Sequence, residues 1–252
     1  MYTKFKKSLG QNFLKDEYYI QKTIDCVHFS KISNFLEIGP GDGQLTEKII
    51  QLNQPLKLIE IDKKLYQILS TRFADHDNVD VINGDILKMD FRLLCDRNSI
   101  ILGNLPYNIS SQIIFNLLES GIEYEYAVFL IQKELADRFM PKEHKSNKIS
   151  LQSSYFADFE KLFDIPPNAF YPVPKVDSTL IKINPKTKKY NLSEYNGLKK
   201  ILSVCFANPR KQLSSPLKKL FPSIPDFSFS LTKRPEDLAL KHYFEILNKY
   251  GK

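Results

Sequence analysis

The chain has 252 residues, of which 42% are hydrophobic, and it carries a formal net charge of +7. This length accommodates one large α/β domain with a small second domain, and the composition is ordinary for a globular protein. No apolar run approaches the roughly 18 residues that a membrane helix needs, and the polar N-terminus has no signal-peptide pattern. We therefore expect a cytoplasmic protein that has no membrane partner.

The positive charge is concentrated near the C-terminus. Pro185 to Lys252 contains 14 basic and 5 acidic residues, which leaves 22 basic and 24 acidic residues for Met1 to Asn184. A near-neutral body with a basic appendage fits a polyanionic partner, because Lys and Arg neutralise backbone phosphates. Charge alone leaves a lysine-rich soluble surface as the alternative.

Cysteine and histidine show no metal-binding spacing. The three cysteines, Cys26, Cys95 and Cys205, are scattered along the chain, and the four histidines form no spaced cluster. We expect reduced structural thiols and no metal site.

Apolar β-rich runs alternate with amphipathic stretches through the first two-thirds of the chain, which is typical of repeated β-α units. We expect strands at Phe35 to Gly39, Leu56 to Ile61, Val79 to Ile82, Ile100 to Leu102 and Ala127 to Ile131, and helices at Thr46 to Leu52, Lys63 to Phe73 and Ile109 to Leu118. Right-handed crossovers between them predict a doubly wound α/β domain.

The last part of the expected sheet is a hairpin, followed by a change of fold class. Phe159 to Ile165 and Thr179 to Ile183 would complete seven strands. The polar segment that begins at Pro185 separates this first domain, residues 1–184, from a small helical domain, residues 185–252. We expect the helices of the second domain at Leu198 to Ala207, Leu213 to Leu220 and Glu236 to Tyr250.

A glycine-rich turn follows the first expected strand. The string Glu37-Ile-Gly39-Pro-Gly41-Asp-Gly43 leads from that strand into a helix, and its glycines allow a tight backbone turn under a nucleoside-sized ligand. A dinucleotide fingerprint needs a third glycine three residues after its second, and Gln44 does not supply the glycine expected there. The pattern therefore disfavours a nicotinamide cofactor. The alternative to a nucleoside-binding turn is a turn with a structural role only.

Carboxylates follow the next two strands. Glu60, at the end of the second strand, is placed to accept from ribose hydroxyls, whereas Asp62 is better placed to cap the following helix. Asp85 follows the third strand and suits an adenine amino group. Three strand ends thus converge on one adenosyl-shaped crevice.

The fourth strand ends in Asn104-Leu-Pro-Tyr107. An adenine amine is a poor nucleophile because its lone pair is delocalised into the ring, so acceptors must draw its hydrogens out of plane. The Asn104 amide and the backbone carbonyl of Leu105, held by Pro106, supply two such acceptors, and Tyr107 supplies a stacking face. The alternative is that this segment is an ordinary loop turn without a catalytic role.

These motifs resemble the KsgA/RsmA-type ribosomal RNA adenine dimethyltransferases along nearly the whole chain. The resemblance implies a Rossmann-like class I methyltransferase domain with a C-terminal all-α domain. The matching segments are Ser8 to Leu14, Glu37 to Gly43 with Leu45-Thr46, Ile59 to Asp62, Gly84-Asp85, Asn104 to Tyr107, Gln132 to Glu134 and Phe170 to Ser178.

The resemblance also implies a role for individual residues. Asn12, Leu14, Gly39, Glu60, Asp85 and Asn104 would hold S-adenosylmethionine, and Asn104, Leu105, Pro106, Tyr107 and Phe170 would form the catalytic pocket. Tyr107 and Phe170 would lie on the two faces of the target adenine. Phe170, followed by prolines, is expected to be a rigid exposed ring, with core packing as the alternative.

The implied reaction is dimethylation of two adjacent adenosines in the 3′-terminal hairpin loop of small-subunit (16S) rRNA, coupled to subunit biogenesis. The expected partner is this rRNA or a 30S assembly intermediate, bound by a monomer that needs no metal. The glycine spacing at Gly41 and Gly43 is closer to that of Erm enzymes, which methylate large-subunit rRNA, and leaves that activity as an alternative. A ribosome-assembly factor with secondary catalytic activity is another.

Overall fold

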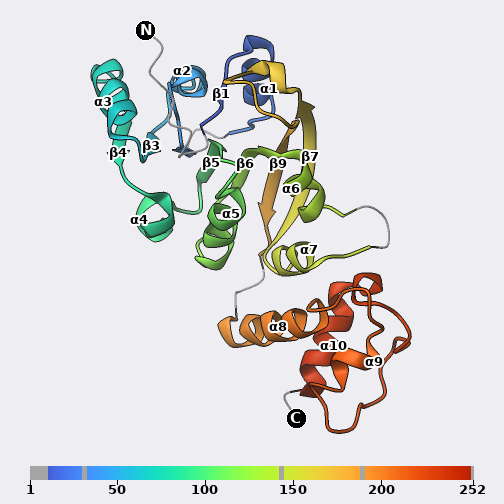
Figure 1. The fold of residues 1–252 in the computed structure, drawn as a ribbon. Helices are drawn as coiled ribbons and strands as arrows, with labels where there is room; N and C mark the ends of the chain where they lie inside the picture. The colour runs from blue at the N-terminus through green and yellow to red at the C-terminus, as the bar shows by residue number, and fades with distance from the viewer. Residues whose placement is uncertain (1–10, 30–32, 142–144, 188–190, 251–252) are drawn as a thin grey trace. The chain divides into compact units, whose positions relative to one another are not determined.

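The structure, a computed structural model, describes residues 11–29, 33–141, 145–187 and 191–250 (Figure 1). Part of the N-terminal motif, Ser8 to Gly10, lies outside these residues. The chain divides into two compact units, Met1–Ala136 with Phe159–Pro185, and Asp137–Asp158 with Lys186–Lys252. The division after Pro185 lies one residue from the expected domain boundary, whereas residues 137–158, which we expected in the first domain, group with the second unit.

Seven strands form one sheet. They are β2 (Asn34–Ile38), β3 (Leu56–Glu60), β4 (Val79–Asn83), β5 (Ser99–Asn104), β6 (Tyr126–Gln132), β7 (Ala157–Ile165) and β9 (Ser178–Pro185). All but the first two residues of β7 belong to the first unit. Their order is β4-β3-β2-β5-β6-β9-β7. The pairs from β4 to β6 are parallel and β9 is antiparallel to β6. The expected seven-stranded α/β sheet is confirmed.

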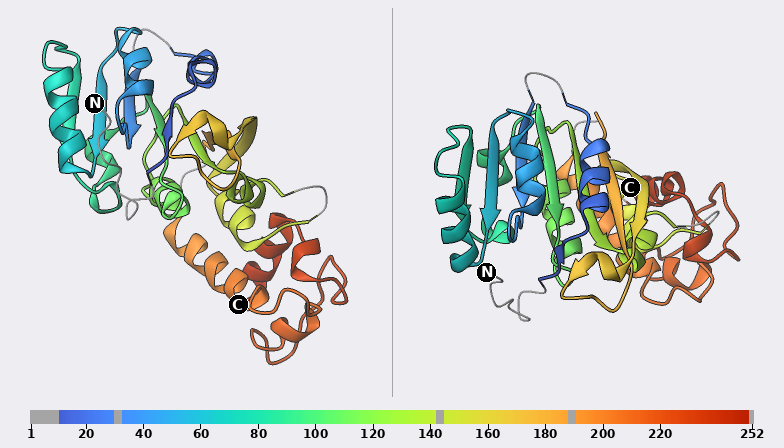
Figure 2. Two further views of the ribbon diagram at one scale, coloured as in Figure 1. Left: turned by 45° about the horizontal axis from the view of Figure 1, so that its top comes forward. Right: turned by 90° about the horizontal axis from the view of Figure 1, so that it is seen from above.

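Helices cover both faces of this sheet (Figure 2). They are α1 (Glu17–Asp25), α2 (Gln44–Ile50), α3 (Lys63–Arg72), α4 (Phe91–Leu94), α5 (Ser110–Glu119) and α6 (Lys133–Phe139). From β2 the chain runs through α2 to β3 and through α3 to β4. It then crosses back through α4 to β5 and continues through α5 to β6 in the opposite direction. Right-handed crossovers therefore place α2 and α3 on one face of the sheet and α4 and α5 on the other. In the part of the chain that the structure describes, no helix is long and apolar enough to span a membrane.

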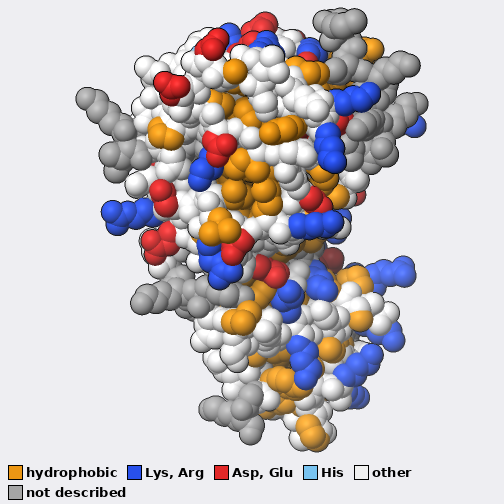
Figure 3. All heavy atoms as spheres, turned by 90° about the vertical axis from the view of Figure 1, so that its left-hand side faces the viewer, with side chains coloured by type: hydrophobic (Ala, Val, Ile, Leu, Met, Phe, Trp, Pro, Cys, Tyr) orange, Lys and Arg blue, Asp and Glu red, His pale blue; other side chains and the backbone are white. Residues whose placement is uncertain are grey.

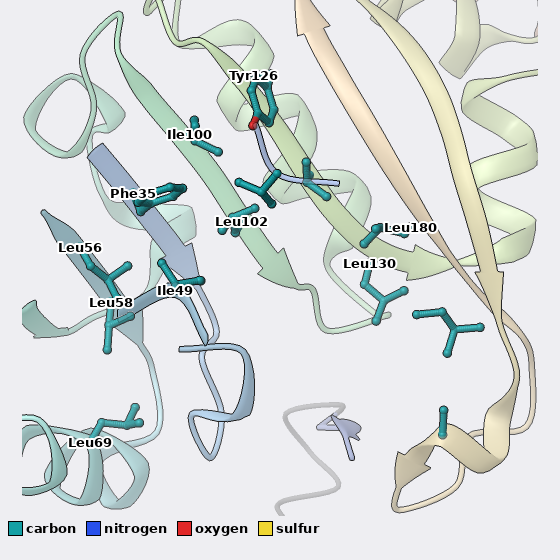
Figure 4. Close-up of a cluster of buried hydrophobic side chains, with 14 of the residues drawn as sticks. Phe35, Ile49, Leu56, Leu58, Leu69, Ile100, Leu102, Tyr126, Leu130 and Leu180 are labelled. Carbon is teal, nitrogen blue, oxygen red and sulfur yellow. The ribbon is translucent and has the colours of Figure 1, made fainter. Parts of the chain in front are cut away.

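The core of the first unit lies between the sheet and these helices. Alternate side chains of β2, β3 and β5 meet α2 and α3 on one face; Phe35, Ile49, Leu56, Leu58, Leu69, Ile100 and Leu102 are at most 1% exposed (Figure 4). The intervening Leu36, Ile38 and Ile101 are equally buried and point to the other face. Because both faces are covered, the strands are almost continuously apolar, and each buried Leu or Ile contributes about 1.5–3 kcal/mol.

The strand order creates a switch point beside β2. From β2 the chain proceeds to β3 and β4 on one side, and then crosses to β5 and β6 on the other. In open α/β sheets a ligand crevice forms at the carboxyl ends of the strands that flank such a point. The ends of β2, β3 and β5 are therefore the place where this fold binds a ligand.

A second, two-stranded sheet was not predicted from the sequence. β1 (Phe13–Leu14) pairs antiparallel with β8 (Phe170–Tyr171), with Phe13 opposite Tyr171 and Leu14 opposite Phe170. The backbone N–H groups of Lys15 and Asp16 both donate to the carbonyl of Ala169, at 2.8 and 3.2 Å. The segment before α1 is thereby fixed beside residues 169–171.

The second unit is helical. It contains α7 (Lys148–Ser153), α8 (Leu192–Cys205), α9 (Ser214–Leu217), the 3-10 turn η4 (Pro235–Asp237) and α10 (Leu240–Tyr250). α8 begins before the expected Leu198, because the Asn191 side chain accepts from the N–H of Glu194 and caps the helix. Tyr195, Leu198, Leu202, Tyr243 and Ile246 form the centre of a separate core.

Candidate active site

A pocket of about 910 Å³, including space open to solvent, lies at the carboxyl ends of β2, β3 and β5. It brings together most of the residues to which the sequence assigned a role: Asn12, Leu14, Gly39, Glu60, Asp85, Asn104, Leu105, Pro106 and Tyr107 all line it. Phe170 is not among the lining residues. The segment before α1 forms one wall, so the pocket has contributions from five places along the chain.

The glycine loop after β2 forms the floor of the pocket. Gly39 and Gly41 have φ angles of +68° and +62°, a left-handed conformation that side chains other than glycine rarely adopt. A Cβ on Gly41 would lie 2.7 Å from the ring of Phe13. The loop thus requires glycine for its backbone, and at Gly41 also for close contact with the N-terminal segment.

The side chain of Glu60 is held beneath this loop. Its carboxylate accepts from the N–H of Gly41 at 3.2 Å and from the N–H of Asp62 at 2.8 Å, one bond to each oxygen. Glu60 is 4% exposed, and burial raises its pKa to about 7. A carboxylate has about four acceptor sites, so the group can still accept from a ligand hydroxyl beside these backbone donors. Asp62 caps α3 by accepting from Lys64, as predicted.

Glu37 is a second buried carboxyl in the pocket wall, and the sequence reading gave it no role. It is 2% exposed and accepts from the hydroxyl of Thr46 at 2.6 Å. Burial raises the pKa of Glu37 to about 7, and the nearby Glu60 adds to the rise. A carboxylate within the otherwise apolar strand Phe35 to Ile38 was the sequence feature that could have identified it.

Asp85 lies at the same edge of the sheet as Glu60. Its side chain accepts from the N–H of Leu87 at 3.0 Å, and the N–H of Gly84 donates to the carbonyl of Glu60 at 3.0 Å. This second bond ties the ends of β3 and β4 together. The structure therefore brings Glu60 and Asp85 to one side of the pocket.

Asn104 has a defined amide orientation. Its Nδ2 donates to the backbone carbonyl of Asn12 at 2.6 Å. A carbonyl only accepts, so this contact assigns the amide nitrogen and leaves Oδ1 as the acceptor of the side chain. The Pro106 carbonyl accepts from Ser110 Oγ at 2.8 Å and from the N–H of Ile109 at 3.1 Å. Among the described residues, the Leu105 carbonyl has only a long 3.5 Å contact with Ser110 Oγ, and no group there donates to Asn104 Oδ1, so both oxygens keep acceptor capacity.

Tyr107 is fixed by its hydroxyl, which lies 2.5 Å from Ser178 Oγ at the start of β9. The ring is partly buried, and burial raises the pKa of the phenol. The neutral tyrosine therefore presents a ring of fixed position to the pocket.

The expected exposure of Phe170 is wrong. Its side chain is 2% exposed and belongs to the hydrophobic core, because its place in β8 opposite Leu14 turns it toward the interior. Core packing, the alternative left open by the sequence, describes this ring. Contact with a target adenine would require the ring to leave that packing, and this role stays a prediction.

Comparison with known proteins supplies the family. A family model described as ribosomal RNA adenine dimethylase matches residues 2–242. The chain belongs to this family. Two curated relatives are both named ribosomal RNA small subunit methyltransferase A. The one from Pelagibacter ubique is 35% identical and aligns over 99% of this chain and 98% of the relative. The one from Francisella tularensis is 34% identical and aligns over 98% of this chain and 97% of the relative.

Solved structures show the same fold along the chain. A dimethyladenosine transferase from Plasmodium falciparum has a TM-score of 0.79 and 25% identity, covering 94% of this chain and 98% of that one. The 23S rRNA methyltransferase ErmE has a TM-score of 0.73 at 20% identity, covering 95% and 100%, and this likeness concerns the fold alone. The expected α/β class I methyltransferase fold is confirmed.

As a ribosomal RNA adenine dimethylase, this chain is a methyltransferase, and the resemblance found in its sequence is confirmed. The small-subunit names of its relatives fit the large-subunit alternative less well. Within the described ranges, no group of three or more His, Cys, Asp or Glu side chains is arranged to hold a metal ion.

Proposed function

We propose that this dimethylase transfers methyl groups from S-adenosylmethionine to the exocyclic amines of two adjacent adenosines in the 3′-terminal hairpin loop of small-subunit rRNA. The observation that carries the proposal is the convergence of Glu60 and Asp85 in one pocket with two oxygens that keep acceptor capacity, Asn104 Oδ1 and the Leu105 carbonyl. We place the reaction in the biogenesis of the small subunit and expect the enzyme to act as a monomer.

The donor half of the pocket fits an adenosyl group. Glu60 has acceptor capacity left for ribose hydroxyls, Asp85 lies at the same edge for the adenine amine, and Gly39 lets the backbone pass closely beneath the ligand. Asn12 and Leu14 would close the pocket from the N-terminal segment. S-adenosylmethionine would supply an electrophilic methyl group; the residues named here bind and orient it.

The target half activates the amine without a charged base. Asn104 Oδ1 and the Leu105 carbonyl would accept the two amine hydrogens and draw them out of the ring plane, so that the nitrogen lone pair becomes available for attack. Pro106 holds the Leu105 carbonyl in place, and Tyr107 would stack on the base. Positioning of the amine is the main catalytic contribution.

The basic second unit is proposed to bind rRNA. Exposed cations on it include Lys200, Arg210, Lys211, Lys218 and Lys219. Lys and Arg side chains gather on the part of this unit that Figure 3 shows, in the lower half of the view. We assign residues 185–252 to an RNA-binding domain that recognises structured rRNA largely through shape and phosphate contacts.

The test uses purified protein, labelled S-adenosylmethionine, and small and large ribosomal particles isolated from cells that lack the enzyme. We expect dimethyladenosine at two adjacent positions of the small-subunit rRNA. The matched control is Asn104→Ala, which should bind the particles and leave them unmethylated. Label in large-subunit rRNA would contradict the proposal and support the large-subunit alternative. In cells that lack the enzyme, growth rescue by Asn104→Ala equal to that by the wild type would contradict it as well and support the assembly-factor alternative.

A further inference from the structure

Two segments that carry the family resemblance have no role in the proposed function. They are residues 132–134, at the end of β6 and the start of α6, and Asp177-Ser178, at the start of β9. The structure joins them: Gln132 is the register partner of Ser178, and the backbone N–H of Lys133 donates to the carbonyl of Asp177 at 3.0 Å. Because β6 is parallel to β5, this junction lies at the same edge of the sheet as the pocket.

Ionic contacts and a buried hydroxyl secure the start of β9. Lys133 Nζ lies 3.0 Å from a carboxylate oxygen of Asp164, near the end of β7, and 3.7 Å from one of Asp177. The hydroxyl of Thr179, which is 0% exposed, donates to Asp164 at 2.6 Å. A single partly exposed ion pair contributes little, but these contacts together join β6, β7 and β9. They fix the backbone on both sides of Ser178.

The side chain of Ser178 is directed to Tyr107. Ser178 is 0% exposed, and its Oγ lies 2.5 Å from the hydroxyl oxygen of Tyr107. Tyr107 lines the pocket, whereas Ser178 does not. The serine can therefore act on the reaction through the tyrosine ring rather than by touching a ligand.

The ring of Tyr107 is held at both ends of its long axis. At one end the loop that carries it is fixed, because the N–H of Leu105 donates to the carbonyl of Leu130 on β6 at 3.0 Å. At the other end the hydroxyl contacts Ser178. A change of χ1 would move the hydroxyl away from Ser178, whereas rotation about the long axis would keep the contact. The contact therefore selects one χ1 rotamer of the tyrosine.

We propose that Ser178 is a positioning residue, which keeps the Tyr107 ring in the rotamer that offers a stacking face to the target adenine. A ring that is already in place loses no rotamer freedom when the base enters, and this favours capture of the base. The inference rests on the proposed function, since it takes the ligand in front of Tyr107 to be an adenine.

The first measurement needs no RNA. Tyrosine labelled with an NMR-active isotope at Cζ, which lies on the ring axis and is unaffected by ring flips, is incorporated into the wild type and Ser178→Ala. The signal of Tyr107 is the one that disappears when Tyr107→Phe is added to each protein. We expect one narrow signal in the wild type and a broadened or doubled signal in Ser178→Ala, because the ring would then exchange between rotamers.

The second measurement is a double-mutant cycle on the single-turnover methylation rate at subsaturating small-subunit particles. Ser178→Ala and Tyr107→Phe each remove one partner of the same contact, and both keep the ring. We expect each to lower the rate by about threefold to tenfold, the usual range for one hydrogen bond. The double variant should be no slower than the slower single variant, because the contact can be lost only once. S-adenosylmethionine affinity should stay within about twofold.

Denaturant unfolding of the same variants separates positioning from a structural role. Each single variant leaves one hydroxyl of the pair without its partner, and the double variant leaves neither, so the double variant should be at least as stable as the single ones. A structural role would restore the rate together with the stability, whereas positioning keeps the rate low.

The matched control is Ser99→Ala. It removes a serine hydroxyl that is also 0% exposed, at the start of β5, where it donates to Asn34 at 2.6 Å and does not line the pocket. We expect this variant to lose stability and to keep its methylation rate within about twofold of the wild type.

A single narrow Tyr107 signal in Ser178→Ala, a wild-type rate in that variant, losses that multiply in the double variant, or a rate that recovers in it would each overturn the inference. If the wild type leaves small-subunit particles unmethylated, the proposed function fails, and this inference fails with it. A wild type that methylates the particles, with Ser178→Ala equally fast, leaves that function standing and removes only the role of Ser178.

Discussion

The amide of Asn104, at the end of β5, donates to the backbone carbonyl of Asn12 at 2.6 Å. The two residues are 92 positions apart, and this bond joins the N-terminal wall of the pocket to the strand end that carries the target acceptors. Because the bond fixes the amide orientation, Oδ1 is held as an acceptor before any substrate arrives. Preorganised acceptors of this kind need no rearrangement during the reaction.

Asn104→Ala should therefore lower the single-turnover methylation rate at saturating RNA by at least about 100-fold, the usual cost of removing one preorganised hydrogen-bonding group from a reacting centre. RNA affinity should change by no more than about threefold. Rapid-quench kinetics and filter binding measure the two quantities. Asn104→Asp keeps an acceptor but cannot donate to Asn12, and it should also be impaired. A wild-type rate in Asn104→Ala would remove Asn104 from the chemistry, and a wild-type rate in Asn104→Asp would show that the bond to Asn12 is not needed.

Glu60→Ala should weaken S-adenosylmethionine binding by about 1–3 kcal/mol, because it removes the proposed ribose acceptor and leaves two backbone N–H groups without their carboxylate. Titration calorimetry gives the affinity. Asp62→Ala is the control: it removes the cap of α3, at a cost of about 1 kcal/mol in stability, keeps the backbone N–H that donates to Glu60, and changes a side chain of a residue that does not line the pocket. If Glu60→Ala bound the donor as tightly as the wild type, Glu60 would have no part in the site.

The buried carboxyl of Glu37 should make stability depend on pH. Its pKa is raised from 4.5 to about 7 in the folded protein, so between these values the folded state holds a proton that the unfolded chain has lost. The free energy of unfolding should accordingly fall as pH rises from about 4.5 to 7, by up to about 1.4 kcal/mol per pH unit for one group. Glu60 acts in the same direction.

Glu37→Gln should make this fall shallower, because Gln can still accept from Thr46 and does not titrate. Denaturant unfolding at pH 5, 6, 7 and 8 gives the dependence for the variant and the wild type. Parallel curves for the two proteins would show that Glu37 does not titrate in this range.

Phe170→Ala should lower the free energy of unfolding by about 3–5 kcal/mol, since the ring belongs to the core. Tyr171→Ala, one residue further, should change it by less than about 0.5 kcal/mol. Thermal denaturation compares the two. If Phe170→Ala kept wild-type stability and accumulated monomethyladenosine, the ring would act on the target base, as the family resemblance implies.

Replacing Arg210 and Lys211 together by Gln should flatten the logarithmic salt dependence of RNA binding by up to about two units of slope, because each lost phosphate contact removes about one counterion release. Both residues are exposed in the second unit. The same change at Lys63 and Lys64, exposed at the start of α3, is the control. A slope altered by the control pair and not by Arg210 and Lys211 would move the RNA footprint to the first unit.

The sequence predicted the sheet and the site where local patterns were strong. Apolar runs identified the strands. Because parallel strands end at one edge of a sheet, the sequence alone predicts that Glu60, Asp85 and Asn104 lie together, and all three line the pocket. The hydrophobic periodicity does not predict β1 and β8, since two residues are too few to show alternation. Without that pairing, the burial of Phe170 and the exposure of Tyr171 could not be distinguished.

Tertiary contacts also decided features that no local pattern contains. Residues 137–158 run up to the first two residues of β7 and were predicted as part of the first domain, yet α7 packs against α8 of the second unit. Glu37 was seen only as a residue before the glycine turn, because its importance comes from burial and from the hydroxyl of Thr46. Sequence reasoning therefore located the pocket, and packing determined which side chains face it.

The most direct test of the central claim is mass mapping of methylated adenosines in rRNA from cells that lack this chain and from the same cells complemented with the wild type or with Asn104→Ala. We predict that two adjacent dimethyladenosines near the 3′ end of the small-subunit rRNA are lost on deletion, return with the wild type and stay absent with Asn104→Ala. Unchanged small-subunit methylation on deletion, or restoration by Asn104→Ala, would contradict the account.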